Sequence, residues 1–185
     1  MKVKGSLLSS VQSFIKENFN TRYQEWVNAL PEASKKIYTN AILASEWYPY
    51  EEGLIQPTTI LARLFYNNDL KQAAWQMGDL ARLSVLKGIY KVFALIATPQ
   101  FIMKRGGKII SSFYDQADLC VGLERPKGVD LYVTKFPSST IITENRIGGW
   151  VEGALEICGV KNVQIEITKS ITKGDDKTVY IVNWD

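Results

Sequence analysis

Residues 69–114 constrain the fold more than any other part of the sequence. In the first part of this stretch, up to Ala81, apolar residues recur at the three- and four-residue spacing of one helix face. Between residues 83 and 96 the apolar residues occupy positions all around the helix. A helix that is hydrophobic on every side has to be enclosed by other parts of the protein. We therefore predict a central helix whose second half lies inside the core.

The composition is that of a single folded domain. Of the 185 residues, 46% are hydrophobic and 22% are charged, and a chain of this length can bury a sizeable core. The net charge of +3 is small and no block of Lys and Arg concentrates it, so we predict no nucleic-acid partner. The apolar runs are shorter than the ~20 residues of a membrane span, and the first residues lack the apolar segment of a signal peptide. We expect one cytoplasmic domain over residues 1–185 without a transmembrane segment.

The absence of histidine restricts the chemistry of the chain. It excludes the Ser-His-Asp and Cys-His nucleophile arrangements, and it excludes histidine-ligated zinc, iron and haem. Glu152 and Glu156 could serve as paired acids, but no partner base accompanies them, and a solvated helix face is the alternative interpretation. Cys120 and Cys158 lack the spacing of a metal site. We therefore predict no metal site and no enzyme.

The pattern of the sequence on both sides of the central stretch predicts an α+β fold. Amphipathic helices precede the central stretch, with Pro57 in the first turn of one and residues 67–69 between two of them. Alternating apolar residues then predict two hairpins, across residues 126–128 and 173–176, with a helix over residues 139–159 between them. Helices followed by local hairpins are typical of antiparallel α+β proteins. We predict an N-terminal helical layer packed on a four-stranded antiparallel sheet built as hairpin, helix and hairpin.

Small residues in the last predicted helix suggest a close contact. Gly149 and Gly153 lie four residues apart and create a flat face on that helix. We expect this face to pack closely against the sheet, since in a protein without a membrane span such a face rarely serves membrane dimerisation.

Five short motifs accompany this order of elements. They are WYP at residues 47–49, GIYKVF at 88–93, TPQFIMKR at 98–105, FYD at 113–115 and GWVEGALEICG at 149–159, of which the last is the most specific. Together they resemble an uncharacterised bacterial family that is abundant in myxobacteria. That family is similar to the ligand-binding fold of haem-NO/oxygen-binding (H-NOX) domains, four-vinyl-reductase hydrocarbon-binding domains and TRAPP vesicle-tethering subunits. The resemblance covers nearly the whole chain and implies a cavity for an apolar ligand.

The chain departs from the resembled domains where their chemistry resides. H-NOX domains hold haem through a proximal histidine and bind its propionates with a Tyr-x-Ser-x-Arg motif, and the chain contains neither. Four-vinyl-reductase domains often carry cysteines flanking a Gly-Asp, whereas Ser170 and Thr178 stand at the comparable places here. We therefore predict no cofactor, and in particular no haem. A cysteine anchors a fatty acyl chain in TRAPP subunits, but no motif carries that site to Cys120.

The central stretch supplies most of the candidate ligand site. Glycine in a buried helix leaves space beside it, so we expect a cavity wall near Gly88, although the same residues could form a filled core. The predicted ligand-binding residues are Leu86, Ile89, Tyr90, Phe93, Phe113 and Trp150.

We predict from these observations a non-enzymatic domain that binds a small apolar ligand, such as a fatty acid or hydrocarbon, and acts as a signalling sensor or adaptor. Two alternatives stay open at this point. One is a TRAPP-like homodimeric interaction scaffold without a ligand, and the other is a tetrapyrrole-binding accessory protein. The sequence identifies neither the ligand nor the downstream partner.

Overall fold

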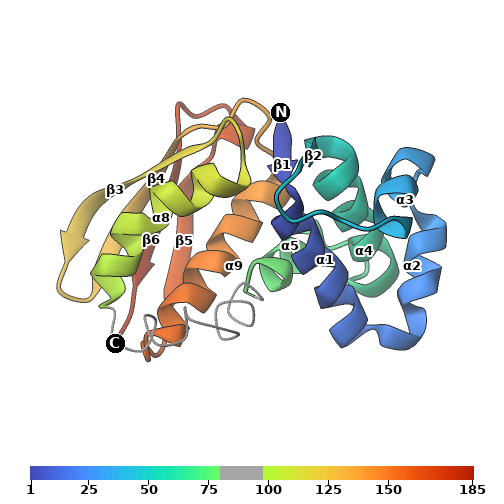
Figure 1. The fold of residues 1–185 in the computed structure, drawn as a ribbon. Helices are drawn as coiled ribbons and strands as arrows, with labels where there is room; N and C mark the ends of the chain where they lie inside the picture. Colours follow the sequence, from blue (N-terminus) through green and yellow to red (C-terminus); the bar gives the residue numbers. More distant parts are fainter. Residues whose placement is uncertain (80–97) are drawn as a thin grey trace.

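The structure, a computed structural model, describes residues 1–79 and 98–185. Helices make up most of the N-terminal part, and the C-terminal part consists of an antiparallel sheet with two long helices against it (Figure 1). The second half of the predicted central helix lies outside the described residues. So do four of the predicted ligand-binding residues, Leu86, Ile89, Tyr90 and Phe93.

The N-terminal part follows the predicted amphipathic pattern. Its elements are β1 (Lys2–Lys4), α1 (Gly5–Asn18), α2 (Tyr23–Ala29), α3 (Glu32–Thr39), β2 (Trp47–Pro49), the π-helix η2 (Glu51–Ile55), α4 (Gln56–Phe65) and α5 (Leu70–Asp79). Helix α1 buries its apolar face, and Pro57 stands in the first turn of α4, which follows η2 without a break in helical backbone. The WYP motif forms β2, which pairs antiparallel with β1 and fixes the start of the chain.

Helix α8 (Pro99–Phe113) begins at a proline, a residue that disfavours helical geometry in the residue before it. Pro99 occupies the first turn, and the hydroxyl of Thr98 accepts a hydrogen bond from the N–H of Phe101 as the N-cap. The helix continues unbroken through Gly106 and Gly107, because both glycines lie against Leu119 of the sheet, where a side chain would not fit without displacement. Within the described ranges, none of the helices combines the length and hydrophobicity that crossing a membrane requires.

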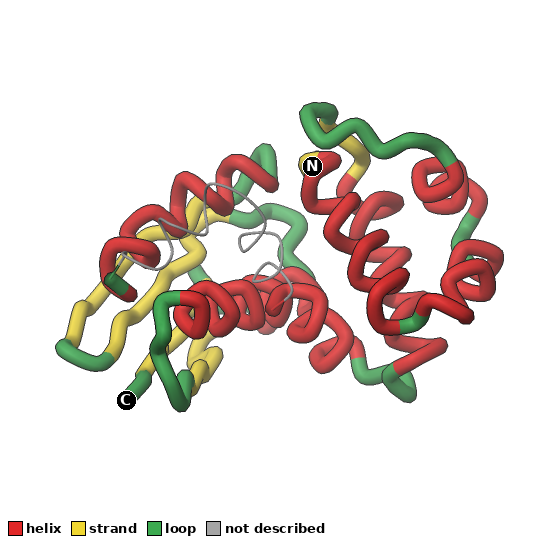
Figure 2. The backbone as a smooth tube through the Cα atoms, turned by 60° about the horizontal axis from the view of Figure 1, so that its bottom comes forward, coloured by secondary structure: helices red, strands yellow, loops and turns green. Residues whose placement is uncertain are grey.

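The sheet confirms the predicted α+β architecture. Its strands are β3 (Asp118–Arg125), β4 (Gly128–Lys135), β5 (Gln164–Lys169) and β6 (Thr178–Asn183), all antiparallel in the order β3-β4-β6-β5. The two predicted hairpins therefore join through β4 and β6, with Leu131 opposite Tyr180. Helices α8 and α9 (Ile141–Ile157) cover the buried face (Figures 1 and 2). Cys120 is exposed, on the other face of its strand from the buried Leu119.

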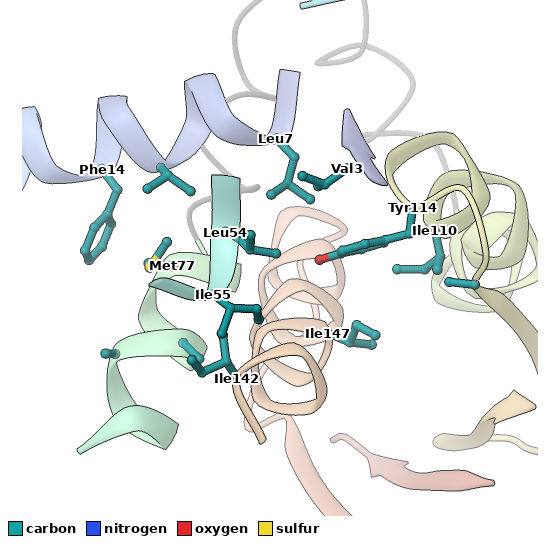
Figure 3. Close-up of a cluster of buried hydrophobic side chains, with 14 of the residues drawn as sticks. Val3, Leu7, Phe14, Leu54, Ile55, Met77, Ile110, Tyr114, Ile142 and Ile147 are labelled. Atoms are coloured by element: carbon teal, nitrogen blue, oxygen red, sulfur yellow. The ribbon is translucent and has the colours of Figure 1, made fainter. Parts of the chain in front are cut away.

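The core is continuous from the helical part to the sheet part. Side chains of α1, η2, α5, α8 and α9 converge in Figure 3, where Leu7, Leu54 and Tyr114 lie in one cluster with Ile147. The cluster places the N-terminal half of α9 at the junction of the two parts, with neighbours on several sides.

The glycine face of α9 packs against α5, which corrects our expectation that it would pack against the sheet. A Cβ atom on Gly149 would lie 2.0 Å from the backbone oxygen of Trp75, and one on Gly78 would lie 2.1 Å from the backbone oxygen of Arg146. The two helices therefore touch through their backbones. Trp75 also donates from its indole N–H to the carboxylate of Glu152, so this acid has a partner on α5.

Candidate functional site

The two predicted ligand-binding residues that the structure describes lie on neighbouring helices. Trp150 of α9 is half-buried, and its ring lies beside Gly106 of α8, where a Cβ would be 3.7 Å from the indole. Phe113, near the C-terminal end of α8, is half-buried and packs against the core. Both helices cover the same face of the sheet. The proposed cavity wall formed with Leu86, Ile89, Tyr90 and Phe93 stays a prediction.

A polar segment that sequence reasoning missed lies in the first turns of α9. Residues 143–146, Thr-Glu-Asn-Arg, are all buried. The helix begins with a capping box in which the hydroxyls of Thr140 and Thr143 each bind the other residue's backbone N–H. Four adjacent polar residues give no signal of burial in the sequence. They are buried because α9 is covered by the N-terminal helices on one side and by the sheet on the other.

Glu144 binds the C-terminal hairpin. Its carboxylate accepts hydrogen bonds from the hydroxyl of Thr178 at 2.6 Å, from the hydroxyl of Ser170 at 2.7 Å and from the backbone N–H of Thr172 at 3.3 Å. The hydroxyl of Tyr180 donates to the backbone oxygen of the same residue at 2.9 Å. Ser170 and Thr178 stand on either side of the loop that contains Gly174 and Asp175. Their hydroxyl groups offset the free-energy cost of burying the carboxylate of Glu144, which is a structural function.

Arg146 points toward the helical part instead. Its guanidinium is only 6% exposed, and Nη2 donates to the hydroxyl of Ser10 on α1 at 3.0 Å. The phenols of Tyr114 and Tyr38 are its nearest titratable neighbours, and Nη1 has no hydrogen-bond partner among the described residues. Burial lowers the pKa of the guanidinium, because the charged form loses hydration. The described groups that interact with this cation, Ser10, Tyr38 and Tyr114, are neutral.

Three tyrosines surround the same junction. The hydroxyl of Tyr38 donates to the backbone oxygen of Gly53 at 2.7 Å, and that of Tyr50 lies 2.8 Å from the hydroxyl of Thr143. The ring of Tyr114 packs edge-on against Phe136 at 5.2 Å. Burial raises the pKa of Tyr38, of Tyr50 and of Tyr114, and the nearby Arg146 charge partly offsets this increase for Tyr114 and Tyr38. These phenols stay protonated at neutral pH.

The buried phenols predict a steep loss of stability in alkali. Burial raises the pKa of Tyr38, Tyr50, Tyr114 and Tyr180 in the folded state, whereas unfolded tyrosines ionise at about pH 10. Above that pH the unfolded state binds fewer protons than the folded state, so the free energy of unfolding falls by about 1 kcal/mol per pH unit for each phenol. Below about pH 10 the contribution is fully present. Phenolate absorbance of these tyrosines should appear together with the loss of helical circular dichroism.

If all phenolate absorbance appeared in one reversible step near pH 10 with the circular dichroism unchanged, the four tyrosines would not be buried as described.

Metal and thiol chemistry have little support in the described residues. No group of three or more acidic or cysteine side chains lies together within residues 1–79 and 98–185. The thiol of Cys158 donates to the backbone oxygen of Ala154 at 3.2 Å, and burial raises its pKa, so the reactive thiolate is disfavoured. Cys158 is half-buried.

Solved structures of H-NOX proteins share this fold. An H-NOX protein from S. oneidensis in the Fe(II)NO ligation state has a TM-score of 0.75 and 12% identity, over 98% of this chain and 99% of that chain. The Fe(II) unliganded H-NOX protein from K. algicida has a TM-score of 0.71 and 10% identity, over 98% and 96%. A structure concerned with heme redox potential and protein-induced porphyrin distortion has a TM-score of 0.68 and 10% identity, over 98% and 99%. No family model and no curated protein matches the sequence.

These neighbours contradict our prediction that haem is not a cofactor. They are proteins described by the ligation state of their iron or by their haem redox potential. The prediction rested on the missing histidine, but methionine, cysteine and tyrosine side chains also ligate haem iron in proteins. The absence of one ligand type does not exclude the cofactor.

Proposed function

We propose that the chain is a ligand-binding sensor domain that holds a small molecule between its helical part and its sheet. The observation that carries this proposal is the H-NOX fold over 98% of the chain, which includes both parts. The buried polar segment of α9 supports it, because this segment lies at the junction of the two parts and contains Arg146, whose Nη1 lacks a hydrogen-bond partner among the described residues.

Haem is one candidate ligand. Without histidine, an iron would take a thioether, thiolate or phenolate ligand. Met77 and Met103 are buried thioethers, and Tyr114 is a buried phenol, so the required donor types are present in the interior. Bound haem would supply an iron atom that binds diatomic gases. The second candidate is a molecule with an apolar body, such as a fatty acid, which the apolar residues of the central stretch favour.

The finer expectations from the sequence belong to this proposal. The domain would be non-enzymatic and cytoplasmic, and residues 1–185 would form one unit. A relationship to the myxobacterial family, and a more distant one to four-vinyl-reductase domains and TRAPP subunits, would account for its motifs. Phe113 and Trp150 would line the site together with Leu86, Ile89, Tyr90 and Phe93.

The decisive experiment is to identify what the purified protein carries and what it binds. Native mass spectrometry and organic extraction should reveal a molecule bound non-covalently in a one-to-one ratio. In parallel, the ligand-free protein should be titrated with hemin and with oleate. A ligand at a concentration 100-fold above its Kd stabilises the folded state by about 2.7 kcal/mol, which raises Tm by roughly 5–10 °C.

The control is Cys120→Ser, because Cys120 is exposed and an acylated cysteine would mimic a bound fatty acid. This variant should retain the bound molecule. A mass of the bare polypeptide together with an unchanged Tm for both hemin and oleate would refute the proposal. A ligand-free homodimer in sedimentation would then favour the interaction scaffold.

A further inference from the structure

The guanidinium of Arg146 is a buried charge without an acidic partner. None of the ion pairs between described residues involves it, and its hydrogen-bond partner Ser10 is neutral. Removing a cation from water costs several kcal/mol unless an anion or a set of hydrogen bonds compensates for it. Arg146 donates to the hydroxyl of Ser10 and interacts with the phenol of Tyr114, both neutral groups, and Nη1 has no hydrogen-bond partner among the described residues.

Among the described residues, Glu144 and Glu152 of α9 bind groups other than Arg146. The nearest acid on the same helix, Glu144, binds Ser170 and Thr178 on the sheet side. Glu152 accepts a hydrogen bond from Trp75. Residues 80–97, which lie outside the described ranges, contain no Asp or Glu.

A comparison within one turn of α9 strengthens this interpretation. Glu144 and Arg146 are both buried and charged. Three donors satisfy the carboxylate, whereas the guanidinium has five N–H groups and meets only neutral oxygens, those of Ser10 and Tyr114, among the described residues. The fork of an arginine matches a carboxylate through two parallel hydrogen bonds. The neighbouring phenol of Tyr114 is a further donor for the same anion.

We propose that the ligand carries a carboxylate, and that Arg146 binds it at the junction of α1, α8 and α9. This inference rests on the proposed function and narrows it. Among apolar ligands it selects acids, such as a fatty acid or a porphyrin with its propionates, over neutral hydrocarbons. The apolar body of the ligand would extend from Arg146 into the core, next to side chains such as Ile147 and Leu7.

The test compares each acid with its neutral counterpart. Oleate is paired with oleyl alcohol, and hemin with hemin dimethyl ester, so that the members of each pair differ in the carboxylate. Comparing the two pairs shows whether the ligand is a fatty acid or a porphyrin. The wild-type protein should bind the acid of at least one pair about 10- to 100-fold more tightly than its neutral counterpart, the range expected for hydrogen bonds to a buried charge. Arg146→Met should abolish that preference, and Arg146→Lys should retain part of it.

The matched control is Arg63→Met, which removes an exposed arginine from α4. It should leave the preference for the acid unchanged. In the ligand-free state Arg146→Met should raise Tm by about 2–8 °C, since it replaces an uncompensated buried charge with an apolar side chain of similar length. An arginine that only stabilises the fold would give the opposite shift.

The outcomes separate this inference from the proposed function. If wild type and Arg146→Met prefer the acid equally, or if the wild type binds acid and neutral probes with the same Kd, Arg146 is not the binding residue although the domain still binds a ligand. If the wild type binds none of the four probes, this inference fails, and the proposed function fails with it when native mass spectrometry also finds only the bare polypeptide.

Discussion

Gly149→Ala is expected to destabilise the protein by about 3 kcal/mol. The new methyl group would lie 2.0 Å from the backbone oxygen of Trp75, and the next nearest atoms, the carbonyl carbon of Trp75 and the nitrogen of Asp79, also belong to the backbone of α5. A clash with backbone cannot be relieved by a rotamer change, so α5 and α9 have to separate, and the packing between them is lost. The higher helix propensity of alanine offsets only about 1 kcal/mol of this cost.

Thermal unfolding measures the effect directly. A loss of 3 kcal/mol corresponds to a fall in Tm of roughly 6–12 °C for a domain of this size. Gly106→Ala is the control, because it is also a helical glycine, but its Cβ would meet a side-chain atom of Leu119 at 3.2 Å. That side chain can adjust, so the control should change Tm by a few degrees at most. Equal shifts for the two variants would show that α5 and α9 are not in backbone contact.

Glu144→Ala is expected to cost about 4 kcal/mol. The substitution removes the acceptor of Thr178, Ser170 and the backbone N–H of Thr172, and it leaves the hydroxyls of Ser170 and Thr178 in a buried environment. Each unsatisfied buried donor costs about 1–3 kcal/mol, and hydrogen bonds to a charged group are the stronger kind. Glu144→Gln keeps the shape but loses the charge and one acceptor atom, so it should fall between wild type and alanine, at about 2 kcal/mol.

Urea unfolding measures the free energy of unfolding of both Glu144 variants. A control shows whether the loss of any acid from the sheet region has the same effect. The control is Glu166→Gln on β5, an exposed residue of the same sheet, which should change the free energy of unfolding by less than about 0.5 kcal/mol. Hydrogen exchange should also accelerate locally in residues 170–178, since this loop is tied to α9 through Glu144. Unchanged exchange in that loop together with a wild-type midpoint for Glu144→Ala would contradict the assigned hydrogen bonds.

Local signals in the sequence predicted the helices and strands, because the start and end of each of these elements depend on residues that are close in the sequence. Thr98 and Pro99 marked the start of α8, and the chain reverses at residues 126–128 as expected. Gly159 was predicted to end α9, and it adopts a φ of 80°, which glycine tolerates best. The second hairpin differs in one respect. Its strands end at Lys169 and begin again at Thr178, because the connecting residues bind Glu144 instead of extending the ladder.

The interior contacts could not be predicted in the same way. Gly149 and Gly153 predicted that another element packs closely against α9. The pattern of one helix does not indicate which element this is. The polar segment at residues 143–146 gave no signal of burial, because polar residues at a helix start are usually solvated. Its burial depends on α1, on the C-terminal hairpin and on their positions in space.

The sequence by itself determined the α+β class, the hairpin-helix-hairpin order and the absence of histidine-based chemistry, because periodicity, turn residues and composition are local or global properties of the chain. Only the tertiary structure decided that α5 and α9 meet through glycines, that Glu144 faces the sheet and that Arg146 faces the helical part without a carboxylate. The physical reason is that burial and charge compensation depend on groups far apart in the sequence, here as distant as Ser10 and Arg146.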